Sequence, residues 1–327
     1  MKIIEMAKNS NRRLVAPLMG FPGTSLTNTT IKANLHNPDI QFKTVHALWS
    51  KFRPDAMFFF MDLTVEAQAI GLPVRFPENE SPSVENHPLK SEADLQNFRV
   101  PNPEKGGRTP IFIDVMKWMQ SLDCARGAYA IGPFTLAGLM MGAQSAAIAT
   151  LKNRNYIKSV LEYTVNVVCE YVKALGRAGA DMIAILEPTA TILSPRAFEE
   201  FSGQYIKRIV GCTQKPIILH ICGDTTHLVK KMCETGAQAL SLDGPVNFPN
   251  IIKDVPQDIV LVGNIDPVRV MMNMKPDQVY SETSKLLESM KGHDNFILST
   301  GCDLPPETPL PNIESFMKCG REFKGRD

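Results

Sequence analysis

The chain has 327 residues, with 35 lysines and arginines against 34 aspartates and glutamates, so its formal charge at pH 7 is +1. It contains no long run of one charge, which argues against nucleic acid as a partner. No uninterrupted apolar stretch approaches membrane length, and the first residues lack the pattern of a secretory signal. The seven cysteines lack the regular spacing of a disulfide framework, so we expect a cytosolic protein with reduced thiols.

Short apolar runs alternate with helical patterns along the chain, which is typical of βα units around a parallel sheet. Eight runs have the length of a buried strand: Leu14–Met19, Ala56–Met61, Ala128–Gly132, Met182–Leu186, Ile217–Ile221, Ala239–Leu242, Ile259–Val262 and Phe296–Ser299. The predicted helices are Ile40–Phe52, Ile111–Ser121, Tyr156–Gly176, Pro195–Val210, Thr226–Glu234, Pro276–Met290 and Ile313–Phe323. Eight strands close a (β/α)8 TIM barrel, an α/β fold. The length also allows two domains, but we expect residues 1–327 to form one barrel.

One interval breaks this alternation. Residues 73–110, between the second and third predicted strands, are rich in proline, asparagine, serine and charge. A loop this long inside a compact domain is commonly functional. Two interpretations remain open: an elaborated loop over the site, or a solvated surface insertion without catalytic meaning.

Two predicted strands end in residues that bind soft metals. His220 and Cys222 are two apart in an extended run, so their side chains point to the same side. Cys302 follows the last predicted strand. One histidine and two cysteines form a set that Zn²⁺ favours, with one tetrahedral position left for a substrate. The alternative is that these three residues lie near strand ends by chance.

Catalytic residues of a βα barrel gather where its strands end. Six further residues at these positions are candidates: Asp62, Gly132, Glu187, Asp243, Asn264 and Asp266. The four carboxylates are candidate catalytic residues, and Gly132 and Asn264 are assigned to cofactor binding. Glu187 would be a fourth zinc ligand or, alternatively, would hydrogen-bond a substrate or the His220 ring. Asp243 and Asp266 would support the metal site or simply stabilise βα turns.

Several segments together resemble the uroporphyrinogen decarboxylase superfamily over essentially the whole chain. They are Asp62-Leu63-Thr64-Val65-Glu66-Ala67, Gly132-Pro133-Phe134-Thr135-Leu136-Ala137, Gly263-Asn264-Ile265-Asp266-Pro267 and Thr300-Gly301-Cys302 with Pro306-Glu307-Thr308-Pro309 and Asn312. The resemblance implies the TIM barrel of that superfamily.

The sequence departs from true decarboxylases at two places. They carry arginines after the first strand that hold the substrate carboxylates, where this chain has Leu18-Met19-Gly20-Phe21-Pro22-Gly23, and Cys302 stands in place of a histidine. The segments around His220, Cys222 and Cys302 instead resemble the corrinoid-dependent methyltransferases, such as the methylcobamide:coenzyme M methyltransferases. This resemblance implies that His220, Cys222 and Cys302 bind zinc, which activates a substrate heteroatom for methyl transfer.

We therefore expect a zinc enzyme that moves a methyl group between a corrinoid (cobalamin) and a small donor or acceptor. The chain has no cobalamin-binding Asp-x-His-x-x-Gly segment, so the corrinoid should arrive on a partner protein. A thiol such as coenzyme M and a methyl ether both remain candidate substrates, and the fourth ligand and oligomeric state are not determined. Two alternatives are a metal-free decarboxylase that uses Asp62 and a non-catalytic barrel that binds a corrinoid protein.

Overall fold

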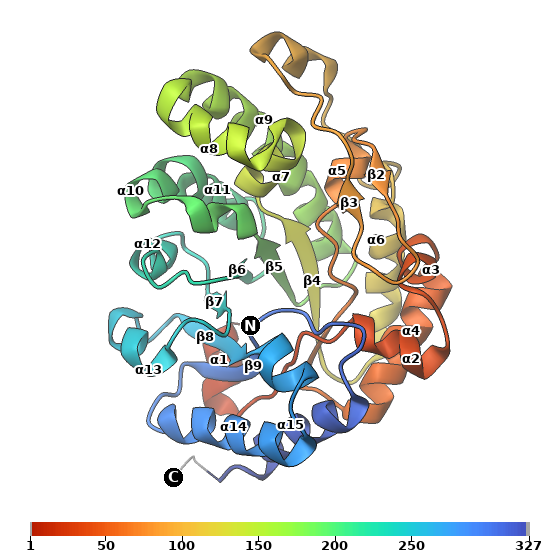
Figure 1. Cartoon of the computed structure of the whole chain (residues 1–327), viewed down its shortest axis with the longest axis vertical. Coiled ribbons are helices and arrows are strands. Elements are labelled where there is room, and N and C mark those ends of the chain that lie inside the picture. The colour runs from red at the N-terminus through yellow and green to blue at the C-terminus, as the bar shows by residue number, and fades with distance from the viewer. Residues whose placement is uncertain (1, 325–327) are drawn as a thin grey trace.

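The computed structural model describes residues 2–324, so the predicted domain range of 1–327 extends beyond it at both ends. Within these residues, seven parallel strands form one curled sheet, with helices around it (Figure 1). In sheet order the strands are β1 (Ala56–Phe58), β4 (Ala125–Ile131), β5 (Met182–Leu186), β6 (Ile217–Ile221), β7 (Ala239–Leu242), β8 (Val260–Ile265) and β9 (Phe296–Thr300). The predicted α/β barrel is confirmed, and seven of the eight predicted strands are present.

The longer helices lie outside the sheet and cover it (Figure 1). They are α4 (Pro38–Phe52), α6 (Thr109–Trp118), α7 (Pro133–Met141), α8 (Ala143–Lys152), α9 (Arg154–Arg177), α11 (Gln204–Gly211), α14 (Pro276–Ser289) and α15 (Leu310–Glu322). Shorter helices are α1 (Ile3–Asn9), α2 (Thr24–Thr27), α3 (Ile31–His36), α5 (Val65–Ala69), α10 (Pro195–Phe198), α12 (Val229–Cys233) and α13 (Phe248–Ile251).

Single turns of other geometry complete the helical segments. They are η1 (Phe21–Gly23), η2 (Glu92–Asn97), η3 (Met119–Ser121), η4 (Pro188–Ile192), η5 (Glu199–Gly203), η6 (Ile252–Asp254) and η7 (Pro267–Met272). All seven predicted helices are present, but the start predicted at Thr226 is wrong, because the Asp224 carboxylate accepts the Thr226 N–H in a turn and α12 begins at Val229. In the described chain no single helix is long and apolar enough to cross a membrane; α7 and α8 meet that test only as a pair bent by 106°.

The predicted first strand is reduced to a single bridge between Val15 and Leu298 of β9. The Ala16 N–H still donates to the Leu298 carbonyl, and the Leu298 N–H donates to the Leu14 carbonyl. The N–H that would continue this ladder is that of Leu18, because Pro17 lies on the side of the segment that faces β1 and has no N–H to donate there. The Leu18 N–H donates instead to the Thr300 hydroxyl. Residues 14–18 therefore fill the eighth strand position and close the barrel without forming a regular strand.

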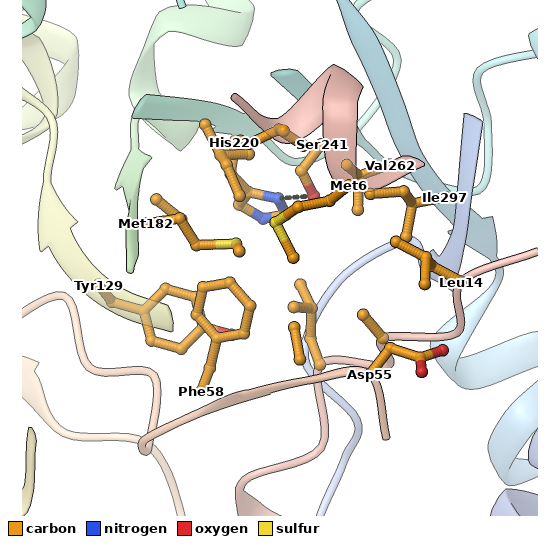
Figure 2. A pocket seen from close by; sticks show the side chains of 16 residues that line it. Met6, Leu14, Asp55, Phe58, Tyr129, Met182, His220, Ser241, Val262 and Ile297 are labelled. Carbon is orange, nitrogen blue, oxygen red and sulfur yellow. Dashed lines mark hydrogen bonds between the residues drawn. The ribbon is translucent and has the colours of Figure 1, made fainter. Parts of the chain in front are cut away.

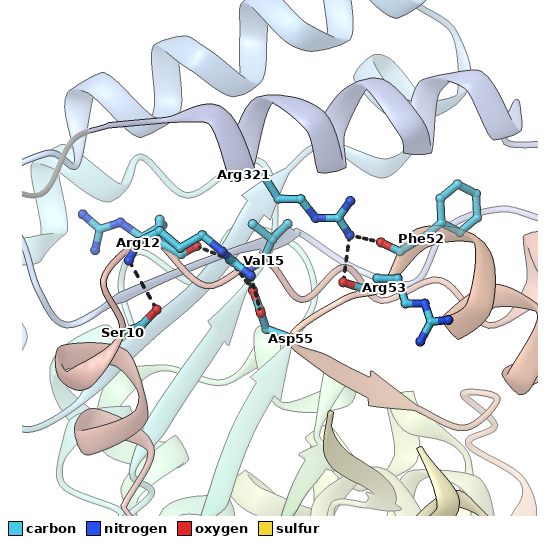
Figure 3. A network of polar contacts seen from close by, with 8 residues as sticks. Ser10, Arg12, Val15, Phe52, Arg53, Asp55 and Arg321 are labelled. Atoms are coloured by element: carbon cyan, nitrogen blue, oxygen red, sulfur yellow. Dashed lines mark hydrogen bonds and ion pairs between the residues drawn. The ribbon is translucent and has the colours of Figure 1, made fainter. Parts of the chain in front are cut away.

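On its other side, the segment around Val15 is joined to the start of β1 by Asp55 (Figure 3). Its carboxylate accepts the Val15 N–H at 2.7 Å and a two-pronged contact from the Arg12 guanidinium at 2.7 and 2.8 Å. The Asp55 N–H donates to the Val15 carbonyl. Nearby, the Arg321 guanidinium of α15 donates to the carbonyls of Phe52 and Arg53 at the end of α4. Side chains thus supply part of the closure that a full strand ladder would give.

The interval 73–110 contains a small hairpin, β2 (Val74–Arg75) with β3 (Ser83–Val84), followed by η2. In Figure 1 its later part projects above α9 and α5. The Leu89 N–H donates to the Met140 carbonyl of α7, and the Tyr163 hydroxyl of α9 donates to the Arg99 carbonyl. The loop is therefore attached to the helices that follow β4, and its role stays a prediction.

Replacing Asp55 by alanine should destabilise the barrel. The change leaves the N–H of fully buried Val15 without its acceptor and removes an ion pair whose side chains are mostly covered, so we expect a loss of about 2–3 kcal/mol in the free energy of unfolding. Urea denaturation followed by circular dichroism measures this. Asp123→Ala, at an exposed position two residues before β4, should change stability by less than about 0.5 kcal/mol. Equal losses in both variants would contradict the closing role of Asp55.

Candidate metal centre

Three of the predicted residues converge at the ends of two strands that lie far apart in the sequence. His220 Nε2 lies 3.0 Å from Cys222 Sγ and 3.6 Å from Cys302 Sγ, and the two sulfurs are 3.1 Å apart. Among residues 2–324 this is the one group of three or more such side chains whose donor atoms lie within 4.8 Å of one another. The sequence prediction that they share one site is therefore confirmed as geometry.

The donor set fits a tetrahedral metal ion of the size of zinc. With zinc–sulfur bonds of about 2.3 Å, two cysteine sulfurs lie roughly 3.8 Å apart, and sulfur and imidazole nitrogen lie roughly 3.5 Å apart. The three separations in the protein need to change by less than about 1 Å to reach these values. The hydrogen bond with Cys222 and burial hold the pKa of the Cys302 thiol well above its ordinary value, so a bound metal would have to displace its proton.

The turn after Cys222 is held in place by its neighbours. Gly223 has a φ of +83°, and its N–H donates to Asp243 Oδ2 at 2.9 Å. The Thr191 hydroxyl donates to the Cys222 carbonyl at 2.8 Å. A Cβ on Gly301 would lie 2.7 Å from Asp243 Oδ1, so only glycine fits beside Cys302. Asp243 therefore holds the turn after Cys222 and packs against Gly301, next to Cys302, while its role toward a metal stays a prediction.

The His220 ring is oriented by β7. Its Nδ1 lies 2.9 Å from the Ser241 hydroxyl, and the two residues are paired across β6 and β7 (Figure 2). A metal-binding imidazole commonly uses its second nitrogen in this way, which fixes the ring and leaves the first nitrogen for the metal. The predicted hydrogen bond between Glu187 and the His220 ring is wrong, because Ser241 occupies that place.

Glu187 lies instead under the start of α7. Its fully buried carboxylate accepts the N–H groups of Phe134 and Thr135, both at 2.8 Å, and the Ser202 hydroxyl at 2.9 Å. Burial raises the pKa of Glu187, while these hydrogen bonds oppose the rise. A Cβ on Gly132 would lie 2.0 Å from a Glu187 oxygen, so glycine is needed there. Both residues position α7, and Glu187 is not part of the donor group described above.

Asp62 is paired with a buried arginine from the end of the 73–110 loop. Arg108 contacts the Asp62 carboxylate at 2.5 Å, with the two side chains 4% and 0% exposed. The Thr64 N–H and hydroxyl both donate to the other Asp62 oxygen. Arg108 also donates to Gln68 and stacks on Phe76. The Asp62 carboxylate thus anchors the loop to the end of β1.

Asn264 and Asp266 both hold backbone turns. The buried Asn264 amide donates to the carbonyls of Asp243 and Val246, which fixes the turn after β7. Asp266 caps η7 by accepting the N–H groups of Val268 and Arg269. Cofactor binding by Gly132 or Asn264 stays a prediction.

Sequence reasoning missed two acids near the strand ends, the half-buried Asp303 and the buried Glu66. Burial raises the pKa of Asp303 to about 7, and one of its oxygens accepts the Gly20 N–H while the other has no hydrogen-bond partner among residues 2–324. Burial also raises the pKa of Glu66 to about 8; its carboxylate accepts the Ile131 N–H. Position beside Cys302 was a signal for Asp303. The position of Glu66, inside a helical segment, gave no signal that its side chain would be buried.

A small apolar cavity of about 30 Å³ lies inside the barrel beneath His220 (Figure 2). Met6 of α1, Met182 of β5 and Tyr129 of β4 are among its lining residues. Burial, together with the acidic and thiol groups of Asp303, Cys302 and Cys222, raises the pKa of Tyr129 well above its ordinary value. Apolar side chains therefore lie on the inner side of the three donor residues, and a substrate must approach the donors from the ends of the strands.

Comparison with known proteins agrees with this fold and identifies a family. A family model described as "Uroporphyrinogen decarboxylase (URO-D)" matches residues 19–323. The methylcobamide:CoM methyltransferase MtbA of Methanosarcina mazei is 28% identical over 272 residues, which cover 80% of this chain and 78% of that protein. A uroporphyrinogen decarboxylase of Prochlorococcus marinus is 25% identical over 300 residues, with 88% and 85% covered.

A solved structure of a methyltransferase from Methanosarcina mazei has the same fold. It superposes with a TM-score of 0.90 at 23% identity and covers 98% of this chain and 97% of that one.

Glu66 should make stability depend on pH. Its folded pKa of about 8 lies above the ordinary 4.5, so its contribution to stability is fully present below pH 4.5 and is lost as the pH rises to about 8. The wild type should therefore lose several kcal/mol relative to Glu66→Gln between pH 5 and pH 9. Urea unfolding at stepped pH measures this difference. Glu80→Gln, at an exposed position, should track the wild type, and a Glu66→Gln curve parallel to the wild type would refute the buried-acid assignment.

Proposed function

The chain belongs to the uroporphyrinogen decarboxylase family, and within it we propose that this protein is a zinc-dependent methyltransferase acting between a corrinoid and a small substrate. The observation that carries the proposal is the convergence of His220, Cys222 and Cys302 at the mouth of the barrel. Similarity to methylcobamide:CoM methyltransferases makes a thiol acceptor the first choice, with coenzyme M as the first compound to test.

Bound zinc would lower the pKa of a thiol placed in the fourth position, so that the thiolate persists at neutral pH and is ready to take a methyl group. The protein's own residues prepare this position. Ser241 orients the His220 ring, and Asp243 holds the backbone beside Cys222 and Cys302. The apolar lining beneath His220 keeps water from that side of the donors.

A corrinoid protein is the proposed partner. The methyl group must pass between cobalt and the substrate heteroatom, so the corrinoid has to reach the strand ends, and the proposed docking face is the mouth of the barrel. The 73–110 loop is anchored there through Arg108 and Asp62 and extends over α7 and α9. We place this loop at the rim of the docking face.

Metal content and methyl transfer test the proposal together. Protein purified from zinc-supplemented medium should contain one zinc ion per chain, and with methylcobalamin and coenzyme M it should form a methyl thioether, followed anaerobically by the visible spectrum of the corrinoid. Cys222→Ala should lose both properties. Cys233→Ser removes another half-buried thiol, in α12, and should keep both.

Each alternative has its own outcome in this experiment. Absence of metal from wild-type protein would contradict the methyltransferase proposal and favour the metal-free decarboxylase alternative. Bound zinc with no transfer to any thiol or from any methyl ether would favour a barrel that binds a corrinoid protein without turnover.

Ser241→Ala should weaken zinc binding without unfolding the protein. Loss of the hydroxyl frees the His220 Nδ1, and loss of such a partner typically lowers metal affinity by about 10–100-fold. Competition with a chromophoric chelator measures the affinity. Ser241→Thr keeps the hydroxyl and should retain most of it. Unchanged affinity in the alanine variant would show that the hydroxyl does not orient the ring.

A further inference from the structure

A second pair of cysteines lies outside the barrel, between α9 and α11. Figure 1 shows these two helices as neighbours. Cys169 lies in the second half of α9, and Cys212 is the residue that ends α11. Both side chains are partly exposed. The pair has no part in the proposed metal site, whose cysteines are Cys222 and Cys302.

Contacts on both sides hold the two cysteines in register. N-terminal to the two cysteines, the Arg208 guanidinium of α11 contacts Glu162 of α9 at 2.5 Å. C-terminal to them, Gly176 of α9 packs against the Lys215 side chain, since a Cβ on Gly176 would lie 3.3 Å from Lys215 Cγ. The contacts advance in the same order along both segments, so the helices run side by side in one direction. Between these contacts the Cys212 Sγ lies 4.0 Å from the Cys169 carbonyl oxygen.

The two thiols interact and differ in acidity. The nearby Cys212 thiol and the positive charges of Lys173 and Arg208 lower the pKa of the Cys169 thiol. The same interaction and burial raise the pKa of the Cys212 thiol. The thiolate is the form that attacks a disulfide, so Cys169 is the more reactive cysteine of the two. The other half-buried helix thiol, Cys233, has its pKa raised by burial to about 11.

We propose that Cys169 and Cys212 are a redox-active pair that forms a reversible disulfide with a small-molecule disulfide as oxidant. The Cys169 thiolate attacks one sulfur of the oxidant, which breaks the oxidant's S–S bond and releases one small thiol. The Cys212 sulfur then attacks Cys169 in the mixed disulfide and releases the second small thiol. The two cysteine thiols lose two electrons and two protons, and the oxidant leaves as two thiols.

The new bond would tie the outer ring of helices across the β5 unit. The closed loop runs from Cys169 to Cys212 and contains β5, Glu187 and η4. Crosslinking a loop of this length restricts the unfolded chain, so the oxidised protein should unfold at a higher temperature. The metal site lies outside this loop, so its donors need not change on oxidation.

Oxidised glutathione, applied to the zinc-loaded full-length protein, tests the proposal. After denaturing alkylation, the wild type should carry two fewer alkyl groups than its untreated form, and dithiothreitol should restore them. Trypsin places Cys169 in the peptide Ser159–Lys173 and Cys212 in Ile209–Lys230, because Pro216 blocks cleavage after Lys215. The second peptide also contains Cys222, so fragment ions must assign the link to Cys212.

Two variants make the test specific. Cys212→Ser should stop at a stable glutathione adduct on Cys169, whereas Cys233→Ser should form the disulfide like the wild type. The oxidised wild type should gain a few degrees in unfolding temperature, and oxidised Cys212→Ser should not. Glutathione adducts on both Cys169 and Cys212 without a crosslink, or a link that involves Cys222 or Cys302 alone, would overturn the proposal. Failure here leaves zinc content and methyl transfer unaffected, so it is distinguishable from failure of the proposed function.

Discussion

The parallel register of the barrel is the constraint on which the site depends. Leu186 pairs with His220, and His220 pairs with Ser241, so the ends of β5, β6 and β7 lie in one row. Pairing of β8 with β9 brings Cys302 to the same end. That pairing is fixed only if the barrel closes. Closure depends on the short segment around Val15, which contacts β9 and Ser299 on one side and Asp55 on the other. A network at the opposite end of the strands, in Figure 3, thus supports the position of a cysteine at the mouth.

Carboxylates around the strand ends serve mainly to hold backbone, and this bears on the chemistry. Asp62 is occupied by Arg108 and Thr64, and Glu187 by the first turn of α7. Neither is a solvent-exposed base, and both are already satisfied by hydrogen bonds. The less committed groups near the mouth are the two sulfurs, the His220 nitrogen and one oxygen of Asp303. Soft donors rather than free carboxylates therefore define this centre, which favours metal chemistry over acid–base decarboxylation.

The sequence predicted the fold and the donor set because both depend on local patterns. Three strands, β5, β6 and β7, begin and end where their apolar runs do, and the spacing of His220 and Cys222 alone predicts convergence. What could not be predicted depends on tertiary contacts. The first predicted strand is cut short because the Leu18 N–H donates to the Thr300 side chain, Ser241 took the place expected of Glu187, and the partner of Asp62 comes from 46 residues away. Burial of Glu66 is likewise set by packing against β4 and has no signature in a helical pattern.

Two pairs of cysteines, Cys222 with Cys302 and Cys169 with Cys212, have different surroundings, and this difference bears on the chemistry proposed for each. Cys222 and Cys302 face an imidazole that is already oriented by Ser241, and the hydrogen bond with Cys222 and burial raise the pKa of the Cys302 thiol. In the proposed site a divalent cation would take the place of the Cys302 proton. Cys169 and Cys212 have no imidazole beside them in the described contacts, and Lys173 and Arg208 supply positive charge without coordinating sulfur. A stabilised thiolate beside a second thiol, at a partly exposed surface, has an oxidant rather than a metal as its natural reaction partner.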